Sequence, residues 1–364
     1  MDKIKLRAFD GIAFTGFLIL PMLFYTGLGR LTRENLAGVW IAMLIAFIII
    51  LSIFLITSSL MKRYETKNII EITSIVLGRP IGYIYAVVLS LYFCYFTGVH
   101  IRETAEILKI YGFILTPLYI IVGLIILVAV VMNFFGGRAI IKSAGFFFII
   151  ILVGIVFVVL VGLNRYNPDN LVPVLGSGMP DIIKNSIFMT SLFDGVMILF
   201  LFAPAFSSAT SMKKTGVITI VLSTAIFILL NLCYVMMFSP TVASTLMSGF
   251  MEIGKSSYYN HFFYRFESIL LFVLIFSSLM LASIGLYISK ESIVQSFHMK
   301  SSKVLIVICI MLIIATALIP ANIHDLMRIY LPLIRQYSAF FIVGFPLLVW
   351  LISSLKRMFK YEKN

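Results

Sequence analysis

Ten long apolar runs constrain this chain more than any other feature of its sequence. A segment of about 20 mostly apolar residues is long enough to cross a bilayer as a helix. Only 12% of the residues are charged and 61% are hydrophobic, whereas a soluble domain has about 25% charged residues. We therefore predict an all-α integral membrane protein with ten transmembrane helices, at 8–28, 36–60, 81–101, 115–134, 140–163, 182–206, 216–238, 262–289, 304–321 and 332–355.

The positions of the basic residues predict how these spans are oriented. The net charge is +13, but the lysines and arginines form short clusters between apolar runs, which indicates loops near anionic lipid and not a nucleic-acid-binding surface. With the N-terminus inside, 18 of the 28 fall in cytoplasmic segments, so both termini are expected in the cytoplasm. The expected organisation is one membrane domain, 1–364, made of a first five-helix repeat (1–163), an outer connection (164–181), a second five-helix repeat (182–355) and a cytoplasmic tail (356–364).

Two segments on the predicted outer side are long enough to have structure of their own. Residues 164–181 are rich in Pro, Gly and Asn, which indicates an irregular connection. Residues 239–261 mix Met, Phe and Tyr with Ser and Gly, and we expect a short helix lying along the membrane interface there.

No residue pattern indicates an enzyme, a metal site or a cofactor. The cysteines Cys94, Cys233 and Cys309 lie far apart in apolar runs without CxxC spacing, which favours small buried core residues. The four histidines are equally scattered. The first apolar segment lacks a small-residue cleavage site after it, so it is expected to remain as a span.

Two similar phrases stand about half a chain apart, FDGIAFTGFLILP at 9–21 and FDGVMILFLFAP at 193–204. They fall in the first and sixth spans, the first helices of two five-span halves, and an odd number of spans per half makes such a repeat inverted in topology. In transporters of this plan the two helices are interrupted near the midplane, where the binding site lies. Gly16 and Pro21, and likewise Gly195 and Pro204, suit such interruptions. Ordinary kinked helices are the alternative.

Other polar and aromatic residues are less specific. Asp10 is expected at the membrane edge, whereas Asp194 lies about twelve residues into its span, where an acid is costly. Three charged residues that end span three, Arg102, Glu103 and Glu106, are expected to be solvated, and Arg265 with Glu267 to form a structural ion pair or to reach the interface. Tyr92 and Phe96 lie one helical turn apart and form either a pocket wall or part of the core. Ser278, Leu281 and Gly285 share a face of span eight and form either a pocket wall or a helix-packing surface.

The chain resembles the B subunit of bacterial spore germinant receptors, the spore germination permease family. The resemblance rests on DNLVPVLGSGMPDIIKNS (169–186), FDGVMILFLFAP, the basic pair Lys213–Lys214 and YRFESI (264–269). That family is similar to the amino acid–polyamine–organocation permeases, which implies a LeuT-like fold with helices 1 and 6 broken. By position, it implies a ligand-binding pocket lined by Phe14, Gly16, Tyr92, Phe96, Asp194, Gly195, Leu281 and Gly285.

The resemblance also implies a function and partners. It implies a sensor in the spore inner membrane that binds a small nutrient germinant, an amino acid or a sugar, beside an A-type membrane subunit and a C-type lipoprotein subunit. A proton- or sodium-coupled amino acid transporter and a conduit for ions or water remain as alternatives. Span one departs from the glycine pair, GxG, of many relatives, reading TGFLILP.

Overall fold

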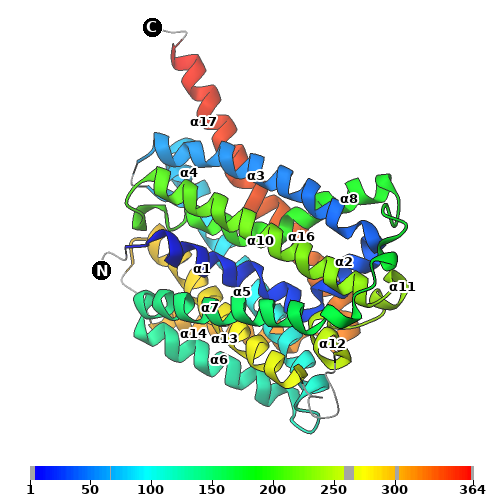
Figure 1. Ribbon diagram of the computed structural model, residues 1–364. Coiled ribbons are helices and arrows are strands. Elements are labelled where there is room, and N and C mark those ends of the chain that lie inside the picture. The colour runs from blue at the N-terminus through cyan, green and yellow to red at the C-terminus, as the bar shows by residue number, and fades with distance from the viewer. Residues whose placement is uncertain (1–4, 66, 258–265, 300–302, 362–364) are drawn as a thin grey trace.

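The computed structural model describes residues 5–65, 67–257, 266–299 and 303–361, and this part of the chain contains helices and turns but no strand (Figure 1). Eight of its helices are long and apolar enough to cross a membrane, and the shorter apolar helices Ala8–Ile19 and Lys303–Leu318 accompany them. Together these helices account for the ten predicted spans.

The first repeat runs from the N-terminus to the end of span five. Its first span is built from three pieces, α1 (Ala8–Ile19), the π-helix η1 (Leu23–Gly27) and α2 (Leu28–Asn35). The other spans and the short helices between them follow in order: η2 (Leu36–Gly38), α3 (Val39–Arg63), α4 (Ile69–Leu77), α5 (Arg79–Tyr111), α6 (Leu118–Phe135) and α7 (Gly137–Val161).

The second repeat begins with the other interrupted span. Span six consists of α8 (Met179–Met189), η5 (Thr190–Phe193), α9 (Asp194–Met197), η6 (Ile198–Phe200) and η7 (Ala203–Ala205). Spans seven to nine are α10 (Ala209–Met237), α13 (Phe266–Ser296) and α14 (Lys303–Leu318), with α11 (Pro240–Ala243) and α12 (Gly249–Ser256) between the first two. Span ten comprises α15 (Ile323–Asp325), η8 (Leu326–Tyr330), α16 (Leu331–Tyr337), η9 (Ser338–Gly344) and α17 (Phe345–Tyr361).

Packing between the helices is reciprocal, as an inverted repeat requires. The first helix of each repeat packs on the second helix of the other, α1 on α10 and α8 on α3. The third helix of each packs on the fourth of the other, α5 on α14 and α13 on α6, while α5 and α13 pack extensively on each other. A two-fold pseudo-axis in the membrane plane produces this exchange. The predicted architecture of two inverted five-helix repeats, with helices 1 and 6 broken, is confirmed.

The structure corrects the bounds of two spans. Span one continues to Asn35, beyond the predicted end at 28, and α5 continues to Tyr111, beyond the predicted end at 101. No glycine or proline interrupts α5 between 102 and 111, and Gly112 then ends it. Polar residues that were expected to lie past the membrane edge therefore belong to a continuous helix.

The interruption of span one also lies later than predicted. Gly16 is inside the regular helix α1, where its Cα faces the ring of Phe148 on α7. The helix ends at Ile19, just before Pro21, and the backbone leaves helical geometry at Tyr25, with φ −82° and ψ −124°. Pro21 therefore follows the end of α1 and Tyr25 marks the break, whereas Gly16 serves close packing.

The two long connections, 164–181 and 239–261, agree in part with their predictions. Residues 164–181 form only the short turns η3 (Leu163–Arg165) and η4 (Pro168–Leu171) before α8 begins, as predicted. The helix α12 is not an interfacial helix. Its residues Phe250 and Met251 are fully buried, and the Phe250 ring lies 4.5 Å from that of Phe24 in η1, between ring centroids. It packs here because its apolar side chains cover the break in span one. Residues 258–261 of this connection, and Arg265, lie outside the described residues.

Candidate ligand site at the two helix breaks

The break in span one is held by a carboxylate from α5. Glu103 Oε1 accepts hydrogen bonds from the backbone N–H of Thr26, at 3.1 Å, and from the Thr26 hydroxyl. Its other oxygen, Oε2, lies 2.9 Å from Nδ1 of His100. Both side chains are almost fully buried. An unsatisfied N–H inside a membrane protein is costly, so Glu103 stabilises the non-helical turn at Tyr25–Thr26.

The break in span six carries its own carboxylate. The backbone departs from α geometry at Phe193, with φ −103° and ψ 10°, and Asp194 follows at the start of a four-residue helix. The Asp194 side chain is fully buried, and its Oδ2 accepts a hydrogen bond from the hydroxyl of Tyr92 on α5. Its other oxygen, Oδ1, has no hydrogen-bond partner among the described residues.

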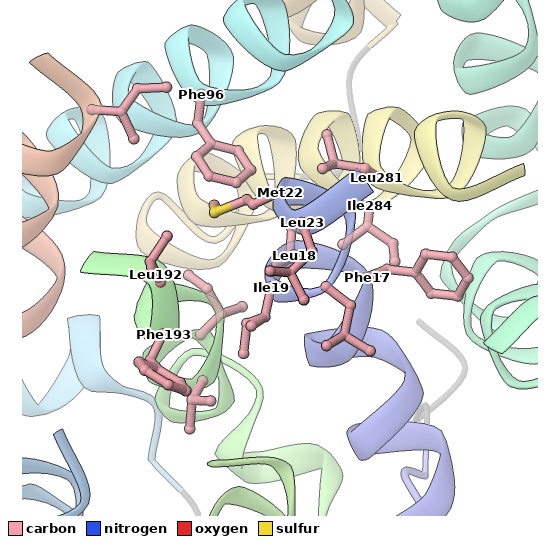
Figure 2. Close-up of a cluster of buried hydrophobic side chains, with 14 of the residues drawn as sticks. Phe17, Leu18, Ile19, Met22, Leu23, Phe96, Leu192, Phe193, Leu281 and Ile284 are labelled. Carbon is pink, nitrogen blue, oxygen red and sulfur yellow. The ribbon is translucent and has the colours of Figure 1, made fainter. Parts of the chain in front are cut away.

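One face of α5 therefore contacts both breaks. Tyr92, Phe96, His100 and Glu103 follow one another at helical spacing and share a face of this helix. The Phe96 ring lies between its neighbours, with ring centroids 6.1 Å from Tyr92 and 4.5 Å from His100. In Figure 2, Phe96 points from α5 toward the turn after α1, where Met22 and Leu23 lie.

A serine from span ten completes the surroundings of Asp194. Ser338 begins the π-helix η9, which packs against η5 and α9 of the broken span six. Its hydroxyl lies close enough to interact with both Tyr92 and Asp194, yet it makes no hydrogen bond to another described residue. A π-helix inside a longer helix is frequently found at functional sites.

Two of the predicted glycines bring helices into close contact. A Cβ on Gly195 would lie 2.6 Å from Cβ of Leu18, so α1 and the broken span six meet at backbone distance. A Cβ on Gly285 would overlap the side chain of Thr97, so α13 and α5 are equally close. Both glycines position the helices around the breaks and leave little space for a larger side chain.

The remaining predicted residues are spread along α1 and α13. Phe14 packs edge-on against Phe202, at 5.3 Å between ring centroids, and against Tyr287, in an aromatic cluster nearer the start of α1. Leu281 belongs to the apolar core beside the α1 turn, as Figure 2 shows. Of the eight residues, Tyr92, Phe96 and Asp194 converge directly, whereas Phe14 lies apart from them with Gly16.

Three charged residues on α5 differ from their prediction. Arg102 and Glu103 are buried and Glu106 is partly buried, although all three were expected to be solvated. Arg102 forms an ion pair with Glu106 at 2.8 Å and donates to the carbonyl of Ala317 on α14. The prediction was wrong because span three was ended ten residues too early. The spacing of Tyr92, Phe96, His100 and Glu103 was the available sequence signal.

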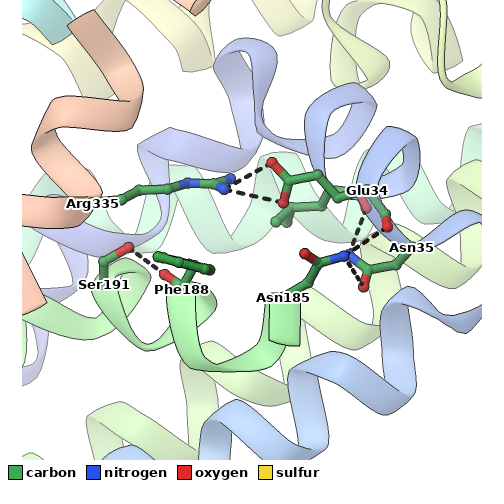
Figure 3. A network of polar contacts seen from close by, with 7 residues as sticks. Glu34, Asn35, Asn185, Phe188, Ser191 and Arg335 are labelled. Carbon is green, nitrogen blue, oxygen red and sulfur yellow. Dashed lines mark hydrogen bonds and ion pairs between the residues drawn. The ribbon is translucent and has the colours of Figure 1, made fainter. Parts of the chain in front are cut away.

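A polar network ties spans one, six and ten together at the end of the bundle away from the N-terminus. Nη1 of Arg335 on α16 lies 2.8 Å and 3.0 Å from the two carboxylate oxygens of Glu34 on α2. The Asn185 amide on α8 donates to the carbonyl of Glu34 at 2.8 Å. Figure 3 shows these contacts side by side. The network joins α2, α8 and α16.

Comparison with known proteins places this chain in a family. The model of a family described as "Spore germination protein" matches residues 14–326. Spore germination protein KB of Bacillus subtilis (strain 168) is 24% identical over 222 residues, 58% of this chain and 59% of that protein. Spore germination protein B2 of the same organism is 26% identical over 194 residues, 52% of this chain and 51% of that protein. The matched region thus spans about half the length of these curated relatives.

Two solved transporters share the fold. A manganese transporter from Eremococcus coleocola superposes with a TM-score of 0.62 at 11% identity, covering 95% of this chain and 78% of that one. Mhp1, a nucleobase-cation-symport-1 family transporter in a closed conformation, superposes with a TM-score of 0.59 at 12% identity, covering 95% and 93%. At these identities the likeness concerns the fold alone. Because the family model covers most of the chain, the protein belongs to the spore germination permease family and has a LeuT-like fold.

Proposed function

We propose that this protein is the germinant-sensing membrane subunit of a spore germination receptor, and that a small nutrient binds where the break of span six meets α5. The observation that carries the proposal is Asp194. It is fully buried in a span, one of its oxygens is bonded to Tyr92, and the other has no partner among the described residues. An acid buried in a membrane span is costly, and such residues are typical of functional sites.

The groups around Asp194 suit a small molecule with an ammonium or hydroxyl group. The free oxygen Oδ1 accepts a hydrogen bond from either group, and the Ser338 hydroxyl can donate or accept. The ring of Phe96 offers an apolar face, and a cation near it gains further from the ring. The proposed germinant is therefore an amino acid or a sugar, with Phe96, Leu281, Gly195 and Gly285 shaping the pocket; Phe14 and Gly16 belong to it only if α1 shifts when the nutrient binds.

Signalling requires that the nutrient bind two conformations differently. Spans one, six and ten meet at the breaks, so a ligand at Asp194 has contacts with the helices that rearrange in this fold. We propose that partner subunits sense the change, an A-type membrane subunit and a C-type lipoprotein, through the connections 164–181 and 239–261. The proposed location is the spore inner membrane with both termini in the cytoplasm.

Binding to the purified full chain tests this proposal. Amino acids and sugars are titrated one at a time, and the unfolding temperature of the protein in detergent is measured. We expect stabilisation by a small subset of the panel, because a ligand that binds only the folded state stabilises it by mass action. No stabilisation by any member would contradict a nutrient site in this chain. A Ser338→Ala variant, expected to weaken the response, locates the site.

A coupled amino acid transporter is the second candidate, favoured by the likeness of the fold to solved transporters. Uptake separates the two functions. Vesicles containing this chain alone are given the stabilising nutrient in labelled form, with a proton or a sodium gradient. Accumulation driven by either gradient would support transport, whereas binding without accumulation supports a sensor.

A further inference from the structure

A large cleft opens at the end of the bundle that carries the N-terminus. Its volume is about 1310 Å³. Its walls come from the chain before α1, the first turns of α1, α7 and α10, and the segment that ends span six, Pro204–Ser207. The backbone N–H of Leu6 donates to the carbonyl of Ala205 at 2.9 Å, so the N-terminal segment is fixed against the end of span six.

The cleft is positively charged. It is lined by Lys5, Arg7, Arg138 and Lys142, and Asp10 is the one acid among the described residues of its lining. The Asp10 carboxylate already accepts a hydrogen bond from the backbone N–H of Arg7, at 3.2 Å. Among the described residues, no carboxylate forms an ion pair with any of the four cationic side chains. The described part of the lining therefore carries an excess of three positive charges, and no carboxylate of the described residues forms an ion pair with them.

Three helices begin at this cleft, which adds to the positive field. The lining includes residues from the first turn of α1, of α7 and of α10. Each helix N-terminus carries about half a positive charge from its aligned peptide dipoles. Converging N-termini and cationic side chains together favour an anion with several oxygens, such as a phosphate group.

The cleft is continuous with an apolar stripe along α7. Phe146 and Ile149 line the cleft and are exposed, and Val153, Val156 and Leu160 continue the same exposed face at helical spacing. An exposed apolar face on a membrane-spanning helix faces lipid chains. A molecule with its anionic group in the cleft and its acyl chain along this stripe satisfies both surfaces, whereas a free phosphate leaves the stripe unused.

We propose that this cleft binds the headgroup of an anionic glycerophospholipid, with an acyl chain lying along α7. Arg138 and Lys142 hold the phosphate from one side, and Lys5 and Arg7 from the other. The bound lipid joins α1, α7 and the end of span six at one site. This inference does not depend on the nutrient site proposed at Asp194.

Native mass spectrometry of the purified full chain in neutral detergent tests the proposal. Phosphatidylglycerol, phosphatidylcholine and glycerol 3-phosphate are titrated separately, and the bound fraction gives each dissociation constant. Neutral detergent has no surface potential, so only direct contacts contribute. We expect phosphatidylglycerol to bind at least about tenfold more tightly than either of the others, because it alone has both the net charge and the acyl chain. This comparison needs no variant.

The double variant Arg138→Gln/Lys142→Gln locates the site. We expect its dissociation constant for phosphatidylglycerol to rise by about tenfold or more, because two charged hydrogen-bond donors are lost. Its matched control is Lys213→Gln/Lys214→Gln, which removes the same charge from exposed positions of α10 outside the cleft lining; we expect no change. Equal losses in the two variants, or equal binding of phosphatidylcholine, would overturn the proposal. Equally tight binding of glycerol 3-phosphate would assign the cleft to a soluble phosphate instead.

Discussion

The two broken helices are both held by a hydrogen bond to α5, but the carboxylate comes from α5 in one case and from the broken helix in the other. In span one, the freed backbone N–H of Thr26 is bonded by Glu103, a carboxylate that belongs to α5. In span six, the carboxylate of Asp194 belongs to the broken helix, and α5 supplies the donor, Tyr92. Both breaks therefore contact the same face of α5. At the break in span one α5 supplies the hydrogen-bond acceptor, whereas at the break in span six it supplies the donor.

The breaks differ in how completely they are satisfied. Both oxygens of Glu103 have protein partners, Thr26 for one and His100 for the other. Only one oxygen of Asp194 accepts a hydrogen bond from a described residue, although the Ser338 hydroxyl and the Gly195 backbone N–H lie close to the carboxylate. The contrast concerns the two carboxylates, because the Tyr25 hydroxyl and His100 Nε2 at the first break also have no hydrogen-bond partner among the described residues. A carboxylate with both oxygens bonded indicates a structural role, whereas one with a free oxygen retains the capacity to bind. The comparison favours a folding role for Glu103 and supports the proposal that Asp194 recognises the ligand.

The largest expected effect concerns Glu103. Replacing it by Ala removes the acceptor of the Thr26 N–H and the partner of His100, and both lie in the protein interior. Each buried hydrogen-bonding group that is left without its partner costs about 1–3 kcal/mol, and this variant leaves more than one. We expect the Glu103→Ala variant to unfold at a much lower temperature in detergent and to give little folded protein.

The exposed carboxylate Asp169 provides the control for that variant. Asp169→Asn removes a negative charge from the connection before α8, where the side chain is exposed. We expect its unfolding temperature to match that of the wild type. A Glu103→Ala variant as stable as this control would show that the break in span one does not need its carboxylate, and the distinction between the breaks would fail.

A smaller effect is expected where the broken helices touch. A Cβ on Gly195 would lie 2.6 Å from Cβ of Leu18, too close without movement of one helix. Overpacking of this kind costs about 1–3 kcal/mol. We expect Gly195→Ala to lower the unfolding temperature and to impair nutrient binding together. Gly123→Ala on α6, where a Cβ would meet nothing within 4 Å, is the matched control and should leave both unchanged. Equal behaviour of the two variants would mean that the helices have room to separate.

Much of the fold could be predicted because the length of each apolar run and the positions of the basic residues can be read directly from the sequence. The ten apolar runs predicted the spans, and the repeated FDG phrase predicted which two are broken. Asp194 was identified because an acid deep inside an apolar run is costly and is typical of a functional site. These features are visible without knowing which helices touch.

The rest depended on contacts between distant helices. Glu103 was expected to be solvated because its helix was ended too early, and its bond to Thr26 joins residues far apart in sequence. Ser338 carries no local signal, since only packing of η9 against span six brings it to Asp194. Gly16 was expected at a break, but the close approach of Phe148 explains it. Spacing along one helix cannot reveal such partners.

Nutrient binding by the Asp194→Asn variant tests the difference between the breaks most directly. Asn preserves the size of the side chain and can still accept from Tyr92, but it cannot ionise. Each amino acid and sugar of the panel is titrated into wild-type and variant protein, and the unfolding temperature is recorded with and without it. We predict an unchanged unfolding temperature without nutrient and binding weakened by about tenfold or more, because a hydrogen bond to a charged group is lost. Unchanged binding, or a loss of stability like that of Glu103→Ala, would contradict a ligand-binding role for Asp194.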